Sequence, residues 1–409
     1  MTMALDGLRV VDLTQVMAGP FCTMLLADLG ANVIKVEPPA GDLSRGMGGD
    51  RLRMTGDDRA PFLALNRNKR SIVLDLKNPD DLNRILKLAR GADVLVENFR
   101  PGVAERLGIG YTSLSAMNPL LIYASISGFG QTGPYADRPG FDLIAQGMAG
   151  VMSVTGSSDG EPVKCGVPVS DLAAGLYATT AILAALVSRH RTGIGQQVET
   201  SLFEAALGLS VWEATEYFAT GDPPSALGSA HRLSAPYQAL RASDGYITVA
   251  ALTPAHWERL CRVLGRPQLT SDARFATNAD RLANRHVLVA ELESALAVGT
   301  VAEWVGRLLA EGVPAGPLYD YAQVFADPHT RARHMVQTVE HPVEGPVRTL
   351  GFPIRMSGTP PGVRRPPPLL GEHTQAVCQA LDARTDPWEP PAPPSRLARP
   401  TAPQHGGSE

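Results

Sequence analysis

Hydrophobic positions in the first 130 residues follow two alternating periodicities. Short runs rich in Val, Ile and Leu have the length of buried strands, and longer segments between them have helical spacing. The runs predict strands over 8–13, 32–37, 71–76, 93–97 and 120–127. The longer segments predict helices over 20–29 and 79–90. Strands that alternate with helices indicate βαβ units and a mostly parallel sheet.

The later part of the chain has a different pattern. We predict a long helix over 170–191, rich in Ala and Leu, and a strand over 196–200. The pattern breaks near 221–224 (GDPP), and 225–325 has the mixed periodicity of a smaller α+β domain. The prediction is therefore an α/β protein with a Rossmann-like large domain over 1–200, a linker over 201–224, a small domain over 225–325 and a flexible Pro-rich tail over 382–409.

Composition narrows the class of protein. Of 409 residues, 44% are hydrophobic and 19% charged, which excludes a mostly disordered chain. The 37 basic and 41 acidic residues provide no basic excess, so we expect no nucleic-acid partner. The four cysteines lie too far apart for a metal-binding pair, and no metal site is predicted. No signal peptide is apparent, and the longest apolar run, 172–187, is short for a membrane span, so we expect a cytoplasmic protein with no membrane partner.

The usual nucleotide-binding fingerprints are missing. The first predicted strand leads into 14–20 (TQVMAGP) rather than a GxGxxG turn, and no GxxxxGK[ST] motif occurs. NAD and ATP are therefore poorly supported as ligands.

Asp171 stands at the entrance of the long predicted helix and has two interpretations. An aspartate at this place is commonly a structural N-cap. The same place keeps a carboxylate ionised and presents backbone N–H groups to an anion, so Asp171 is also a candidate nucleophile. Spacing alone leaves both interpretations open.

Other candidates also have two interpretations. Gly128 and Gly130 follow a strand in SGFGQTG and form either an oxyanion-binding loop or an ordinary loop. A set of cations either binds phosphates or forms a solvated basic face, namely Arg67, Lys69, Arg70, Arg100 and Arg106. His231 either lines a cleft between domains or is an ordinary surface or core histidine.

Several motifs occur together in one order: 5–12 (LDGLRVVD), 18–20 (AGP), 29–37 (LGANVIKVE), 41–45 (GDLSR), 68–71 (NKRS), 97–102 (ENFRPG), 127–130 (SGFG), 195–196 (GQ) and 369–374 (LLGEHT). The series resembles the class III CoA-transferases, the formyl-CoA and carnitine CoA-transferase group, whose fold the α-methylacyl-CoA racemases share. Each motif alone is weak, whereas the series from about residue 5 to 380 is specific.

The resemblance implies a mechanism and an assembly. The family's catalytic aspartate falls on Asp171, which would attack an acyl-CoA, form a mixed anhydride and then an aspartyl-CoA thioester, and pass CoA to an acceptor acid. CoA and acyl-CoA are then substrates, and no cofactor is permanently bound. The resemblance also implies that residues 326–381 return to the large domain and that two chains form an interlocked homodimer. Carried over by position, the CoA contacts are Gln15, Val16, Ala18, Arg45, Lys69, Asn98, Phe99 and Arg106.

Departures from the family patterns narrow the activity. Racemases carry His-Asp where this chain has Phe141 and Asp142, and a phenylalanine cannot abstract an α-proton. Met17 and the 228–231 loop (GSAH) differ from the oxalate enzymes and favour larger acids, including dicarboxylates. We predict transfer of CoA from an acyl-CoA, with succinyl-CoA as a candidate donor, to a small organic acid. A racemase that uses Asp142 with Asp171 and a non-catalytic CoA-binding paralogue are the alternatives.

Overall fold

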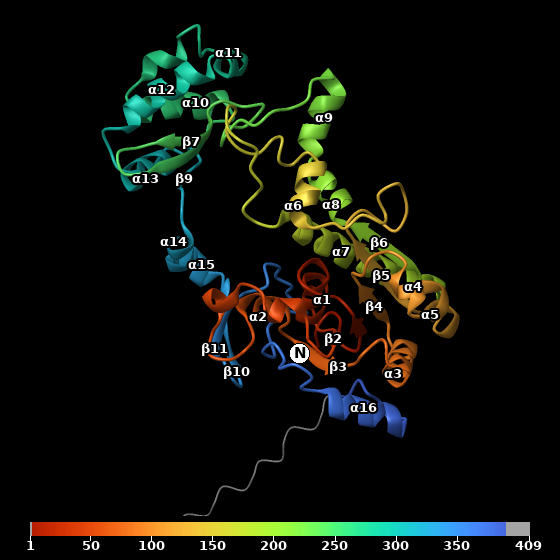
Figure 1. Ribbon diagram of the computed structural model, residues 1–409. Helices are drawn as coiled ribbons and strands as arrows, with labels where there is room; N and C mark the ends of the chain where they lie inside the picture. The colour runs from red at the N-terminus through yellow and green to blue at the C-terminus, as the bar shows by residue number, and fades with distance from the viewer. Residues whose placement is uncertain (1, 390–409) are drawn as a thin grey trace, which may run out of the picture. The chain divides into compact units, whose positions relative to one another are not determined.

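A computed structural model describes residues 2–389 of the chain. The chain divides into two compact units (Figure 1). Of the described residues, the first contains 2–139, Ala174–Ser201 and 337–389, and the second contains Gly140–Ala173 and Leu202–Val336. The chain therefore leaves the first unit after Pro139, well before the boundary predicted at 200. It returns to that unit over Ala174–Ser201, which contains most of one helix and one strand.

The first unit is built on a six-stranded parallel sheet in the order β3-β2-β1-β4-β5-β6. The strands are β1 (Arg9–Asp12), β2 (Asn32–Glu37), β3 (Lys69–Val73), β4 (Val94–Glu97), β5 (Ile122–Ser127) and β6 (Gln197–Ser201). Val10 of β1 pairs with Val33 on one side and with Val94 on the other. The strand order reverses between β1 and β4, and ligands of open parallel sheets bind at the carboxyl ends of strands at such a point.

Helices and one hairpin complete the first unit. They are α1 (Ala18–Asp28), η1 (Leu43–Arg45), η2 (Gly49–Leu52), α2 (Ala60–Leu65), α3 (Pro79–Arg90), α4 (Val103–Arg106), α5 (Tyr111–Met117), the part of α7 (Val169–Thr192) from Ala174 onward, β10 (Val336–His341), β11 (Gly345–Leu350) and α16 (Thr374–Ala383). Helix α3 begins where predicted because Asn78 caps the N–H of Asp80 and Pro79 occupies the first turn. Val11, Ile34 and Leu95 are buried in the core beside it.

The second unit has its own core around a three-stranded antiparallel sheet, β7-β8-β9. Its elements are α6 (Asp142–Met148), α8 (Leu202–Leu209), α9 (Val211–Thr220), β7 (Tyr237–Arg241), β8 (Tyr246–Ala250), α10 (Pro254–Val263), η3 (Pro267–Thr270), α11 (Asn278–Ala283), α12 (Arg285–Leu296), α13 (Val301–Ala310), β9 (Ala315–Pro317), α14 (Tyr321–Ala326) and α15 (Pro328–Ala332). Helices and antiparallel strands both occur within 225–325. The predicted linker over 201–224 is wrong, because α8 and α9 occupy most of it.

Helix α7 has 24 residues and a mean hydropathy of 1.5 in its most apolar 18-residue window, so by length and composition it could cross a membrane. It is longer than the apolar run seen in the sequence. A core helix has the same properties, and α7 buries Ala174, Ala178 and Ile182 completely or almost so.

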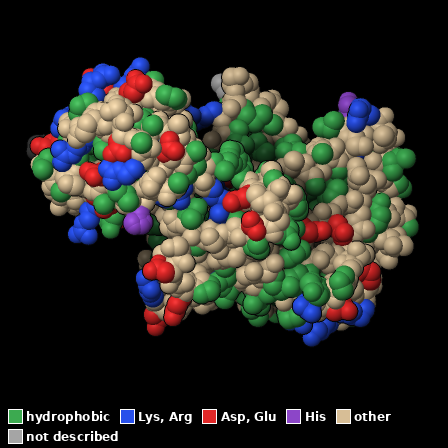
Figure 2. Space-filling model, turned by 90° about the horizontal axis from the view of Figure 1, so that it is seen from above, with side chains coloured by type: hydrophobic (Ala, Val, Ile, Leu, Met, Phe, Trp, Pro, Cys, Tyr) green, Lys and Arg blue, Asp and Glu red, His purple; other side chains and the backbone are tan. Residues whose placement is uncertain are grey.

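Figure 2 shows acidic and basic side chains interspersed on the face that it presents.

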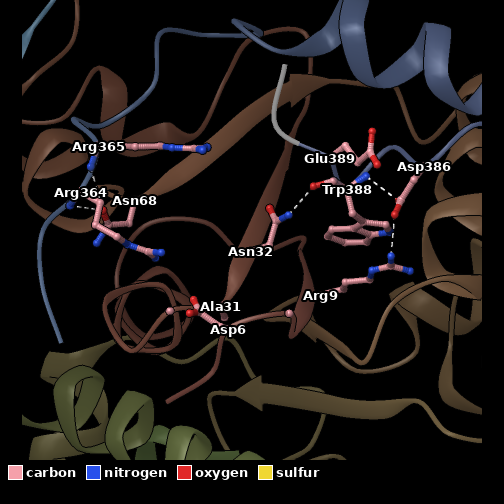
Figure 3. A pocket seen from close by; sticks show the side chains of 12 residues that line it. Asp6, Arg9, Ala31, Asn32, Asn68, Arg364, Arg365, Asp386, Trp388 and Glu389 are labelled. Carbon is pink, nitrogen blue, oxygen red and sulfur yellow. Dashed lines mark hydrogen bonds and ion pairs between the residues drawn. The ribbon is translucent and has the colours of Figure 1, made fainter. Parts of the chain in front are cut away.

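The segment after α16 closes the amino-terminal edge of the sheet (Figure 3). Arg9 pairs with Asp386 at 2.6 Å, and the Asn32 side chain donates to the carbonyl oxygen of Trp388. The Trp388 ring is buried in the core of the first unit, beside a polar cavity of about 510 Å³. Residues 382–389 are therefore packed rather than part of a flexible tail. The rest of the predicted tail, 390–409, lies outside the described residues.

Replacing Trp388 with leucine is expected to lower the free energy of unfolding by about 2 kcal/mol, because a buried ring is lost and a cavity remains. Urea denaturation measures the change. Trp212→Leu is the matched control, because Trp212 is 61% exposed, and we expect a loss under about 0.5 kcal/mol. Equal losses in the two variants would contradict this role of the segment.

Candidate active site

The loop after β1, residues 14–18, lies where the strand order reverses. Asn98, which follows β4, holds this loop through two hydrogen bonds: its Oδ1 accepts from the Gln15 N–H and its Nδ2 donates to the Gln15 carbonyl, both at 2.9 Å. Side-chain amides thus join the ends of β1 and β4. Asn98 was predicted to contact CoA, and in this structure its amide holds the loop.

The loop leads directly into α1. Ala18 opens that helix, and no side chain caps its first N–H groups. Gly19 is required at the next position, because a Cβ there would lie 2.4 Å from the Thr14 side chain. An uncapped helix start at the carboxyl edge of a sheet suits a phosphate oxygen. The structure therefore places Gln15, Val16 and Ala18 at a site compatible with the predicted CoA contacts.

Phe99 and Arg106 lie beyond β4 at the same edge. The Phe99 N–H donates to the Glu97 carboxylate at 2.8 Å, and its ring packs against the core of the first unit. Arg106 ends α4 with an exposed side chain, and no carboxylate pairs with it among residues 2–389. Its guanidinium is free for an anionic ligand.

Lys69 and Arg45 do not have the role predicted for them. The Lys69 ammonium is fully buried and donates to Asp12, to the Pro20 carbonyl and to Asn66 at 2.8–3.1 Å, so no donor remains for a phosphate. Arg45 is 7% exposed, with its guanidinium paired to Glu37 and Asp58. Both cations neutralise buried acids near the sheet edge.

Electrostatics agree with this structural role. Burial lowers the pKa of Lys69 to about 8 despite the adjacent Asp12 carboxylate. Burial alone would raise the pKa of Asp12, but Lys69, Lys35 and two threonine hydroxyls outweigh it and hold the pKa at about 2. Asp12 is therefore a permanent buried anion that needs its lysines.

Two other predicted cations, Arg67 and Arg70, also have partners within the chain. Arg67 pairs with Asp28 at 2.7 Å, and Arg70 donates to Asn32 and to backbone carbonyls of the C-terminal segment. His231 stacks on Tyr237 with ring centroids 4.8 Å apart and lines a cavity within the second unit. No group of metal-ligating side chains occurs in the part of the chain that the structure describes.

The glycine loop after β5 offers fewer donors than predicted. Gly130 has a φ of 94°, which favours glycine, and its N–H already donates to the Ser127 hydroxyl at 2.9 Å. That N–H is therefore not free for an oxyanion. Gly128 directly follows β5, in the loop where it was predicted.

Asp171 is the third residue of α7, not the residue that caps it. The cap interpretation is therefore wrong, because Asp142 occupies that role: its Oδ1 accepts from the Ser170 N–H at 3.0 Å. Asp171 itself is half-buried, and no donor within residues 2–389 contacts its carboxylate. Burial, and next the Asp142 carboxylate, raise the pKa of Asp171 to about 7.

Two residues that the sequence analysis did not assign hold the start of α7. Gln146 donates to Asp142 at 2.7 Å and accepts from the Cys165 N–H at 2.9 Å. Asp142 was considered only as a racemase base, although it lies 28 residues before Ser170 and no local pattern connects the two. Further along α7, a Cβ on Gly175 would lie 2.8 Å from the Ala18 carbonyl oxygen, so this helix packs closely against the start of α1.

Comparisons with known proteins identify relatives along most of the chain. The chain is 40% identical to the succinate–glutarate CoA-transferase of Agrobacterium fabrum, over 92% of this chain and 96% of that one. It is 42% identical to succinyl-CoA:mesaconate CoA-transferase of Haloarcula hispanica (90% and 94% covered) and to acetyl-CoA:oxalate CoA-transferase of Acetobacter aceti (91% and 94% covered).

A solved structure of a CaiB/BaiF family protein from Brucella suis superposes with a TM-score of 0.84 at 42% identity, covering 93% of this chain and all of that one. The family model for CoA-transferase family III matches residues 5–374. The chain belongs to CoA-transferase family III.

Proposed function

We propose that this enzyme transfers CoA from a dicarboxylic acyl-CoA such as succinyl-CoA to a small carboxylic acid, with Asp171 as the nucleophile. The observation that carries the proposal is a half-buried carboxylate with no hydrogen-bond donor, held by its helix in the first turn of α7. Three relatives are named for transfer to glutarate, mesaconate and oxalate, which are all dicarboxylates. Oxalate thus stays among the acceptors to be tested, although Met17 and the 228–231 loop argue against it.

The covalent route follows from the chemistry of a carboxylate nucleophile. Asp171 attacks the thioester carbonyl, the C–S bond breaks, and CoA leaves as a thiolate with an acyl-aspartyl anhydride formed. The thiolate then attacks the aspartyl carbonyl and releases the donor acid. The acceptor carboxylate attacks the resulting aspartyl-CoA thioester, which breaks the C–S bond, releases the thiolate and forms a second anhydride. The thiolate then attacks the acceptor's carbonyl, and the Asp171 carboxylate leaves and is regenerated. Thioester energy is retained throughout, so no ATP is consumed.

Two features of the chain support this route. The uncapped start of α1 and the free Arg106 guanidinium offer donors for the CoA phosphates. The carboxylate of Asp171, in the first turn of α7, is half-buried and next to a second carboxylate, Asp142, and burial and then this neighbour raise its pKa. An interlocked homodimer and a cytoplasmic location belong to the same proposal.

Asp142 is poorly placed to be the base of a racemase. Its two carboxylate oxygens accept from the Ser170 N–H and from Gln146, and the residue before it is phenylalanine. These contacts favour the transferase.

Mass spectrometry of one incubation in D₂O tests the proposal. The enzyme is mixed with succinyl-CoA or acetyl-CoA and a panel of glutarate, mesaconate, oxalate and monocarboxylic acids. A new acyl-CoA is expected for a dicarboxylate acceptor and none with Asp171→Ala. A one-unit mass gain on an unchanged branched acyl-CoA would establish racemase chemistry instead, and CoA binding without any product would indicate a non-catalytic paralogue.

The rate of transfer is expected to fall about tenfold per pH unit below about pH 7. Only the ionised Asp171 attacks, and burial together with Asp142 raises its pKa to about 7, so activity rises with pH and levels above that value. The profile of kcat/KM for the acyl-CoA measures this. Asp142→Asn keeps an oxygen for the Ser170 N–H but removes a charge, so the midpoint should move to lower pH. A flat profile between pH 5 and 8 would contradict the assignment.

A further inference from the structure

Val16 has a φ of 70°, in the left-handed region. The other non-glycine residues with positive φ among those described are Asn68, His334 and Arg384, none of which is β-branched. Branching at Cβ makes this conformation costly for valine, so other contacts must impose it. Strain of this kind concentrates at functional sites when the surroundings determine it.

Two side chains hold the backbone immediately before the strained φ, and α1 begins two residues after it. Asn98 makes both of its bonds to the backbone of Gln15. The Asp42 carboxylate accepts from the Val16 N–H at 3.1 Å. The two peptide groups on either side of the Gln15 Cα are therefore held in place. Asn98, which follows β4, bonds to both of them, and Asp42, in the loop after β2, bonds to the second.

Asp42 is itself rigidly held. Its side chain is buried and pairs with Lys35 at 2.8 Å, and it accepts from the Ser44 N–H and hydroxyl. The Lys35 ammonium also donates to the Thr14 carbonyl at 2.7 Å, so one lysine is bonded both to the loop and to the aspartate that holds it. No part of this arrangement requires a ligand, which makes the loop preorganised.

We propose that Asn98 and Asp42 are positioning residues that hold Val16 in its left-handed conformation and so fix the 15–18 loop and the start of α1 for CoA. This inference rests on the proposed function, since it needs that loop to bind CoA. Without the clamp, Val16 relaxes to negative φ, and only the fraction of molecules that keep the left-handed loop binds CoA at full affinity. The apparent Kd rises by the inverse of that fraction.

A double-mutant cycle between Asn98→Ala and Val16→Gly tests this by isothermal titration with CoA. Asn98→Ala alone is expected to weaken binding about tenfold, because the strain of Val16 is no longer opposed on one side. In the Val16→Gly background the same change should cost no more than about threefold, because glycine adopts positive φ readily. The cycle cancels any contact that the Val16 methyl groups make with CoA.

Steady-state kinetics and melting temperatures distinguish a positioning role of Asn98 from a catalytic or purely structural one. Saturating acyl-CoA should restore the kcat of Asn98→Ala, with the loss confined to KM. Asn118→Ala is the matched control, because Asn118 also ties two backbone segments, through the Ala89 and Ala92 carbonyls, away from the loop. It should lower the melting temperature and leave the Kd unchanged.

Equal losses from Asn98→Ala in both backgrounds would overturn the inference, while transfer by the wild-type enzyme would leave the proposed function intact. Failure of the wild-type enzyme to bind CoA would instead refute the function itself. Should Asn98→Ala not fold, Asp42→Ala provides a second cycle with Val16→Gly. It removes the acceptor of the Val16 N–H, so the clamp is released from the other side and the same non-additivity is expected.

Discussion

Replacing Asp171 with alanine is expected to slow CoA transfer by at least roughly three orders of magnitude and to leave the Kd for CoA within about threefold of the wild-type value. The Asp171 carboxyl group is part of every anhydride and thioester intermediate, so no step of the exchange proceeds without it. The donors assigned to the CoA phosphates lie elsewhere, at the start of α1 and on Arg106. Single-turnover assays and calorimetry measure the two quantities.

Asp171→Asn is a second control, and its melting temperature tests the raised pKa of Asp171. The pKa of Asp171 is raised in the folded state, so the stabilisation linked to its proton is present below its unfolded value near 4 and is lost as pH rises through about 7. The neutral amide avoids that loss. Asp171→Asn should therefore melt above the wild-type enzyme at pH 8, with a difference that shrinks at pH 5. Transfer at the normal rate by either variant would refute the role of Asp171.

Local elements were largely predictable from the sequence because their signals are local. Strand β2 occupies the predicted 32–37, and α3 has both predicted ends because Asn78, Pro79 and Gly91 mark them. The division into units was not predictable in this way. The chain leaves the first unit after Pro139 and returns at Ala174 inside one continuous helix, α7, where no change in composition marks the boundary.

Helices α8 and α9 were missed for a related reason. The turn-forming residues at 221–224 are a strong signal, and they end α9 rather than belong to a long linker. The exposed apolar side chains of these helices, such as Phe218 at 81%, blur the helical periodicity that would have identified them.

In the candidate site too, only some residue roles could be predicted from the sequence. Asp171 could be located by family resemblance, whereas the fate of a cation depends on partners that are distant in the chain. Asp12 lies 57 residues before Lys69, and the three hydrogen bonds of the ammonium come from three separate segments. Sequence position alone made Lys69 look like a phosphate ligand, and only the fold shows the acid that it neutralises.

Substituting Lys69 with methionine is expected to lower the free energy of unfolding by about 3–5 kcal/mol, because it leaves the buried Asp12 carboxylate without one of its two lysines. The Pro20 carbonyl and Asn66 lose a donor at the same time. Urea denaturation measures the change, with Lys87→Met as the matched control: Lys87 is half-exposed, its distance to Asp382 is 3.8 Å, and its loss should cost under about 0.5 kcal/mol.

The ligand-binding interpretation of Lys69 predicts the opposite pattern. A phosphate contact would make Lys69→Met nearly as stable as the wild-type enzyme, with a Kd for CoA raised tenfold or more. The buried ion pair predicts a large loss of stability, and any change in Kd should be small under conditions in which the variant remains folded. A stable variant with weakened CoA binding would therefore restore the phosphate role and would mean that Asp12 can be neutralised by Lys35 alone, which the two separate contacts of Lys35, to Thr14 and Asp42, argue against.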